Sequence, residues 1–73
     1  MTKSVADLKS IAASAGGMVL DASRFNAAEL KSIAASAKGK GSRIFLNNVK
    51  SKTTAELKSI AASGGGAVVF DLS

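Results

Sequence analysis

One heptapeptide, Leu-Lys-Ser-Ile-Ala-Ala-Ser, occurs three times in this chain of 73 residues, at 8–14, 30–36 and 57–63. The starts of the three copies are 22 and 27 residues apart. Near-copies at such a spacing are typical of proteins in which each unit packs against the next, because one unit alone cannot bury its apolar face. We therefore expect a single domain made of three similar units.

Each copy is preceded by a pattern that begins a helix. A short polar residue is followed three positions later by an acid, in the pairs Ser4 with Asp7, Asn26 with Glu29, and Thr53 with Glu56. The polar side chain can accept a hydrogen bond from the amide of the acid, and the acid can accept one from the cap amide. Helical spacing also predicts a narrow buried stripe on each helix. In the first copy this stripe consists of Leu8, Ile11, Ala12 and Ala15.

We expect glycines to stop each helix, at 16–17, at 39 and 41, and at 64–66. A short β-prone run follows the glycines, at 18–21, 44–47 and 68–71. The predicted order is αβαβαβ, and equivalent strands joined by helical connections should pair in parallel through right-handed crossovers. We expect an α/β fold with a small parallel three-stranded sheet, solenoid-like, with repeats at about 4–23, 26–49 and 53–73. An insertion at 38–43 should project as a loop from the helix-to-strand side of the middle repeat.

Side chains along a strand alternate between the two faces of a sheet. One predicted face has the larger apolar set, which we expect the helices to cover. Its members are Met18, Leu20, Ala22, Ile44, Leu46, Asn48, Val68, Phe70 and Leu72. The opposite face has one row of apolar residues and, beside it, one row of polar residues. The apolar row is Val19, Phe45 and Val69, and the polar row is Asp21, Asn47 and Asp71.

Two arrangements of the helices fit this pattern. Helices on one side would leave the apolar row around Phe45 uncovered within the chain, whereas helices on both sides, as in a small doubly wound sheet, would bury it. The uniform repeats favour the one-sided arrangement. Because such a small sheet is marginally stable and has two open edges, we expect a homo-oligomer that uses the bare face or a strand edge. The alternative is a monomer with a few exposed apolar side chains.

The residue inventory excludes several classes of function. The chain has no Cys, His, Trp, Tyr or Pro, which excludes disulfide scaffolds, thiolate or imidazole metal sites, and nucleophiles that depend on Cys or His. The remaining acid pair is Asp21 and Asp71, and Asn47 aligns between them. This order favours a hydrogen-bond ladder over acid catalysis, and a hard-cation site at these three residues is the alternative. We expect no enzyme activity, cofactor, metal or small-molecule substrate.

Ten Lys and Arg against five Asp and Glu give the chain a net charge of +5. The basic residues that cluster in sequence are Lys38, Lys40, Arg43, Lys50 and Lys52. The simplest interpretation is a solvated basic surface. The leading functional alternative is weak, sequence-independent contact with the phosphates of a nucleic acid. The absence of Tyr and Trp leaves few aromatic side chains on which bases could stack.

The repeated unit combines a helix containing Leu-x-x-Ile-Ala, an apolar strand, and Asn47 and Asn48 after Leu46. It resembles the leucine-rich repeats, and its 22-residue spacing lies within the range of that family. The likeness covers nearly the whole chain. It implies a protein-binding surface on the exposed strand face, and it identifies no partner.

No apolar run approaches the roughly 18 residues that a membrane span needs. Residues 1–9 lack the apolar stretch of a secretory signal, and together with the absence of Cys this favours a cytoplasmic protein with no membrane partner. A close repeat with so little distinguishing chemistry fits a designed or fragmentary sequence, or a small bacterial protein. The function expected from the sequence is therefore non-enzymatic association with a protein, most simply with a second copy.

Overall fold

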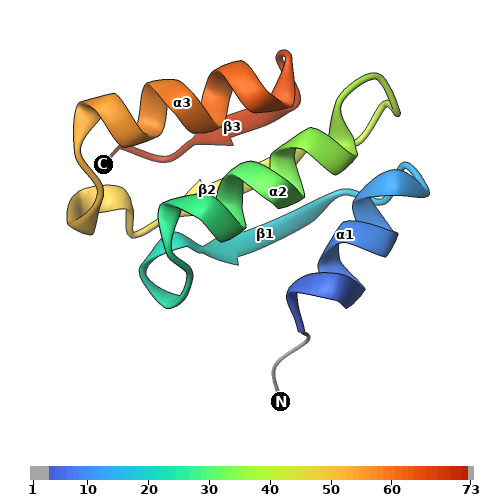
Figure 1. Cartoon of the computed structure of the whole chain (residues 1–73), viewed down its shortest axis with the longest axis horizontal. Coiled ribbons are helices and arrows are strands. Elements are labelled where there is room, and N and C mark those ends of the chain that lie inside the picture. The colour runs from blue at the N-terminus through green and yellow to red at the C-terminus, as the bar shows by residue number, and fades with distance from the viewer. Residues whose placement is uncertain (1–3, 73) are drawn as a thin grey trace.

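The computed structural model of the protein describes residues 4–72. These residues form three α-helices and three β-strands in the predicted alternating order (Figure 1). The helices are α1 (Val5–Ala13), α2 (Ala27–Ala37) and α3 (Thr54–Gly64), and the strands are β1 (Met18–Asp21), β2 (Ile44–Asn47) and β3 (Val68–Phe70). Two 3-10 turns, η1 (Ala22–Arg24) and η2 (Val49–Ser51), follow the first two strands. Ser73, the predicted end of the third repeat, lies outside the described residues.

The predicted helix starts are confirmed in all three repeats. Before α2, the Asn26 side chain accepts a hydrogen bond from the Glu29 amide at 2.8 Å, and the Glu29 carboxylate accepts one from the Asn26 amide at 2.9 Å. The same reciprocal pair begins α1 and α3. Each box satisfies two amides that have no partner within the helix, and it places an acid at the positive end of the helix dipole.

The helix ends differ between the repeats. After α3 the chain turns through Gly65 at φ 55°, a left-handed conformation in which a side chain is disfavoured. After α1 the left-handed residue is an alanine, Ala15 at φ 69°. Ala15 therefore lies exposed past the end of its helix, and the prediction that it belongs to the buried stripe is wrong.

The three strands form a parallel sheet in the order β1-β2-β3. Leu20 pairs with Leu46, and Leu46 pairs with Phe70, which is the alignment predicted from the repeats. The Asp71 amide donates to the Leu46 carbonyl at 2.8 Å and continues the ladder one residue past β3. Equivalent residues of the three repeats therefore lie side by side across the sheet.

All three helices lie over the same face of the sheet, and α2 packs between α1 and α3 (Figure 1). The physical reason is the strand order. Each right-handed connection steps to the next strand in the same direction, so successive helices fall on one side, whereas a doubly wound sheet needs a reversal of strand order. The fold is compact, 28 × 28 × 21 Å, and its description as a solenoid stays a prediction.

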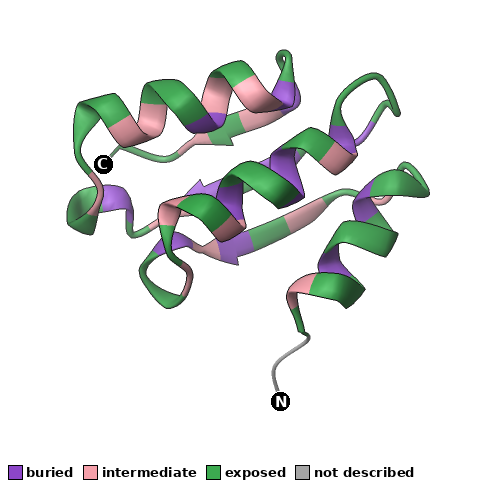
Figure 2. Ribbon diagram, viewed as in Figure 1, coloured by how far each residue is buried: buried purple, intermediate pink, exposed green. Residues whose placement is uncertain are grey.

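The core lies between the helices and the covered face of the sheet, and buried residues recur along all three helices and at the strands (Figure 2). Its largest fully buried apolar side chains are Leu30, Ile33, Ile44, Leu46 and Ile60. Besides Ala15, three residues predicted to be buried are exposed, namely Ile11, Asn48 and Leu72. Alternation stops where β2 and β3 end, which exposes the latter two and lets η2 bury Val49. Ile11 is exposed because α1 precedes the first strand and lies at the margin of the sheet.

Candidate protein-interaction surface

The face of the sheet turned away from the helices, called here the open face, carries the predicted apolar row. Val19, Phe45 and Val69 pair in register across the three strands, one strand spacing apart. They are 69%, 47% and 39% exposed, whereas the inward-facing Leu20, Ile44 and Leu46 are nearly fully buried. The structure therefore brings all three residues of the predicted interface together on one surface.

This exposure is unusual for a parallel sheet. Strands in parallel sheets are normally covered on both faces, and their side chains are correspondingly apolar on both faces. The strands of this chain have that composition, since Val19, Phe45 and Val69 sit opposite the core side chains. Within residues 4–72, however, no element lies over the open face (Figure 1). The surface has the chemistry of a buried layer and lacks a covering layer from the same chain.

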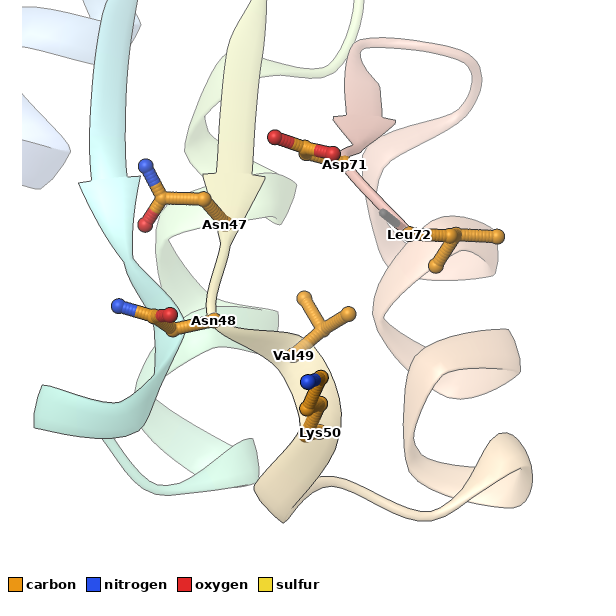
Figure 3. A pocket seen from close by; sticks show the side chains of 6 residues that line it. All are labelled: Asn47, Asn48, Val49, Lys50, Asp71 and Leu72. Atoms are coloured by element: carbon orange, nitrogen blue, oxygen red, sulfur yellow. The ribbon is translucent and has the colours of Figure 1, made fainter.

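The end of the open face at which the strands finish is polar. Asp21 pairs with Asn47, and Asp71 follows β3 beside them. The Asp21 carboxylate accepts hydrogen bonds from the Ser23 hydroxyl and amide, and these bonds, together with an Asn48 contact and the charge of Arg24, lower its pKa. In Figure 3 the Asp71 carboxylate points toward β2, while Leu72 points away from it.

The opposite end of the open face is basic. Arg43 immediately precedes β2, and the alternation that turns Phe45 outward turns Arg43 to the same side. Its guanidinium donates a hydrogen bond to the Gly66 carbonyl at 3.3 Å, so the side chain lies across the sheet toward β3. The open face thus runs from a cation at the amino ends of the strands, through an apolar row, to carboxylates at the carboxyl ends.

The polar end has little of the geometry that acid catalysis or metal binding needs. Asp21 and Asp71 lie on the two outer strands, roughly 10 Å apart at the strand spacing, with Asn47 between them. Among residues 4–72, no three His, Cys, Asp or Glu side chains gather closely enough to hold a metal ion. A shallow pocket of about 300 Å³ lies at the ends of β2 and β3 (Figure 3). It is lined by Asn47, Asn48, Val49, Lys50, Asp71 and Leu72.

The structure divides the predicted basic segment between the two ends of the sheet. Lys38 and Lys40 are exposed in the loop before β2, which projects beyond the helices as expected (Figure 1). Lys50 lies in η2 after β2, at the opposite end of the strand. Lys52 bonds within the protein, because its ammonium donates to the Ala22 carbonyl at 3.0 Å. The five basic residues therefore do not form one continuous patch.

The role of Arg43 on the open face was missed from the sequence, where it was grouped with the basic loop. The period-two pattern already contained the information, because extending it two residues back from Phe45 places Arg43 on the same face. The Arg43 side chain is directed toward β3 by its hydrogen bond to the Gly66 carbonyl, and only the tertiary structure places that carbonyl near Arg43.

No helix within residues 4–72 combines the length and the apolar character that crossing a bilayer requires. Comparison of the chain with protein-family models, with curated proteins and with solved structures gives no significant match.

Proposed function

We propose that the chain is a non-enzymatic module of three repeats, stacked in the manner of a solenoid, whose open face associates with a second copy of itself. The supporting observation is the exposed apolar row of Val19, Phe45 and Val69. These residues lie in register at the centre of a sheet face that no other element of residues 4–72 covers.

The small size of the chain supports this proposal. A domain of this length buries only about 60% of the surface that its unfolded chain exposes, so its folded state has little stability in reserve. Covering the row with a second apolar surface removes further area from water, at about 25 cal/mol per Å². A second copy presents a surface with the same apolar character, so self-association is the simplest way to cover it.

Replacing Phe45 with Lys tests the proposal directly. Phe45 is half exposed and does not belong to the hydrophobic core, so Phe45→Lys should leave the helix content unchanged. We expect the dimer mass measured by light scattering or sedimentation to fall to that of a monomer, because a charge at the centre of the interface would be buried without a partner. Ala35→Lys, an exposed change on α2, adds the same charge and should leave the dimer intact.

A wild-type chain that stays monomeric from micromolar to millimolar concentration would contradict the proposal. So would a dimer whose dissociation constant is the same for the wild type and Phe45→Lys. Association through a strand edge predicts that second outcome, since Phe45 points away from both edges of the sheet.

Nucleic-acid binding is a second candidate, favoured by the exposed Lys38 and Lys40 in the projecting loop and by the net charge of +5. It predicts a mobility shift of DNA at low salt that disappears as the salt concentration rises. The double substitution Lys38→Ala with Lys40→Ala should abolish the shift. Binding that survives this change would exclude the loop as the contact.

A further inference from the structure

The charges on the open face give any face-to-face dimer a preferred direction. We infer that the two copies pack with their strands antiparallel, so that Arg43 of one chain meets Asp71 of the partner subunit. This inference rests on the proposed self-association, and it adds the orientation of the partner and the residues that select it.

The size of the interface requires its charged ends to be buried. A stable protein interface covers about 800 Å² on each partner. A phenylalanine side chain buries at most about 250 Å², so the apolar row centred on Phe45 is too small to form such an interface alone. The whole molecule extends over 28 × 28 Å along its two longer axes, whereas its three short strands cover only about 15 × 15 Å. A stable dimer must therefore include both ends of the open face, and the charges there must be compatible.

Two-fold symmetry allows two limiting orientations of the sheets. If the symmetry axis runs along the strands, amino ends meet amino ends, and Arg43 faces Arg43 of the partner subunit. If the axis runs across the strands through the Phe45 row, the strands of the two copies run antiparallel. Each strand then lies over the same strand of the partner subunit. The amino end of each strand then faces the carboxyl end of the same strand in the partner. Like charges facing each other in an interface are costly, so the second orientation is favoured.

The direction of the Arg43 side chain determines which carboxylate of the partner subunit it can reach. Its hydrogen bond to the Gly66 carbonyl holds the guanidinium beside the start of β3. In the antiparallel dimer that position faces the end of the partner's β3, where Asp71 stands on the open face. Asp21 lies at the end of β1, which is the strand farthest from that position. Lys50 and Lys52, which are also at the carboxyl ends of the strands, lie in and just after the turn that follows β2.

Charge reversal tests the orientation. Arg43→Asp and Asp71→Arg should each weaken the dimer by at least about tenfold, since each contact occurs twice in a two-fold dimer and becomes repulsive. An equimolar mixture of the two variants should restore association to near the wild-type level, because both contacts are again between opposite charges in the mixed dimer. The chain that carries both substitutions should also regain its dimer. Lys31→Asp, on the exposed side of α2, changes the net charge as Arg43→Asp does and should have no effect.

The outcomes separate this inference from the proposed function. If Phe45→Lys dissociates the dimer but Arg43→Asp and Asp71→Arg leave the dissociation constant within about twofold, the antiparallel orientation is wrong and self-association stands. A parallel dimer would gain affinity with added salt, and its doubly substituted chain would still bring like charges together. If the wild type never associates, the proposed function fails first. Circular dichroism of every variant shows whether any loss of mass reflects unfolding.

Discussion

Ser42 shows how a polar residue in a flexible-looking loop can belong to the core. By sequence it stands among lysines and glycines at the end of the insertion, yet it is 2% exposed. Its hydroxyl donates a hydrogen bond to the carbonyl of Ala12, near the end of α1 and thirty residues earlier in the chain. Carbonyls in the last turn of a helix lack partners within that helix. The Ala12 carbonyl accepts one hydrogen bond from the Ala15 amide at 3.1 Å, and Ser42 supplies a second one that ties the loop of the middle repeat to the first repeat.

Replacing Ser42 with Ala should therefore destabilise the fold. The Ala12 carbonyl would keep only its bond from the Ala15 amide, and loss of the buried Ser42 bond should cost about 1 kcal/mol of the free energy of unfolding. Urea denaturation at one fixed protein concentration measures the change. Ser36→Ala is the matched control, because the Ser36 hydroxyl bonds the Ser32 carbonyl within the exposed part of α2 and should change stability by less than about 0.5 kcal/mol. If the two substitutions lowered the free energy of unfolding equally, the buried Ser42 bond would contribute no more to stability than the exposed Ser36 bond.

At the scale of elements, the close approach of α2 to α3 depends on a missing side chain. Gly64 ends α3 at the position where the other two repeats have Ala15 and Ala37. A β-carbon there would lie 2.7 Å from a methyl group of Val68 and 3.3 Å from the β-carbon of Ala34. The third repeat therefore differs from the other two at this position in both sequence and packing, and α3 has less room at its end than α2 does.

Gly64→Ala thus sets two effects of opposite sign against each other. Helix propensity alone would stabilise the protein by up to about 1 kcal/mol. Crowding against Val68 and Ala34 costs about 1–3 kcal/mol, because neither is the mobile end of a long side chain. We expect a net loss of about 1 kcal/mol in thermal or urea denaturation, while Ser63→Ala next to it should be nearly neutral. A more stable Gly64→Ala protein would mean that α3 can move away from α2 at little cost.

At the scale of the whole molecule, stability and association should be coupled. Anything that binds the folded state alone raises its apparent stability, and for a self-associating chain the ligand is the protein itself. The open face leaves a Val, a Phe and a second Val in water in each monomer, so dimerisation stabilises the fold by covering them.

The thermal midpoint of the wild type should therefore rise by a few degrees for each tenfold increase in protein concentration. The midpoint of Phe45→Lys should not depend on concentration, because that variant stays monomeric. Differential scanning calorimetry at several concentrations measures both. A wild-type midpoint that is independent of concentration would indicate a monomer whose exposed row has no partner of its own kind.

The predictions from sequence were accurate where neighbours along the chain decide the structure. Capping pairs three residues apart began each helix, and the shared motif aligned Leu20, Leu46 and Phe70 in register.

The predictions failed at the ends of elements. The prediction that glycines stop each helix holds only for α3, because Ser14 caps α1 and Lys38 caps α2. Asn48 and Leu72 were predicted to be buried because the strand alternation was extended past the ends of β2 and β3, and both are exposed. Ile11 was predicted to be buried because the sequence does not show that α1 lies at the margin of the sheet.

The sequence by itself determined the elements, their order, the pairing of equivalent residues and the apolar character of both sheet faces. These features follow from local hydrogen bonding and from the side-chain period of two in a strand. The same local pattern occurs in each of the three repeats. Only the tertiary structure decided which carbonyls accept hydrogen bonds from Ser42, Arg43 and Lys52. Those contacts join residues more than twenty positions apart, so their geometry depends on how the layers pack and on no pattern within one repeat.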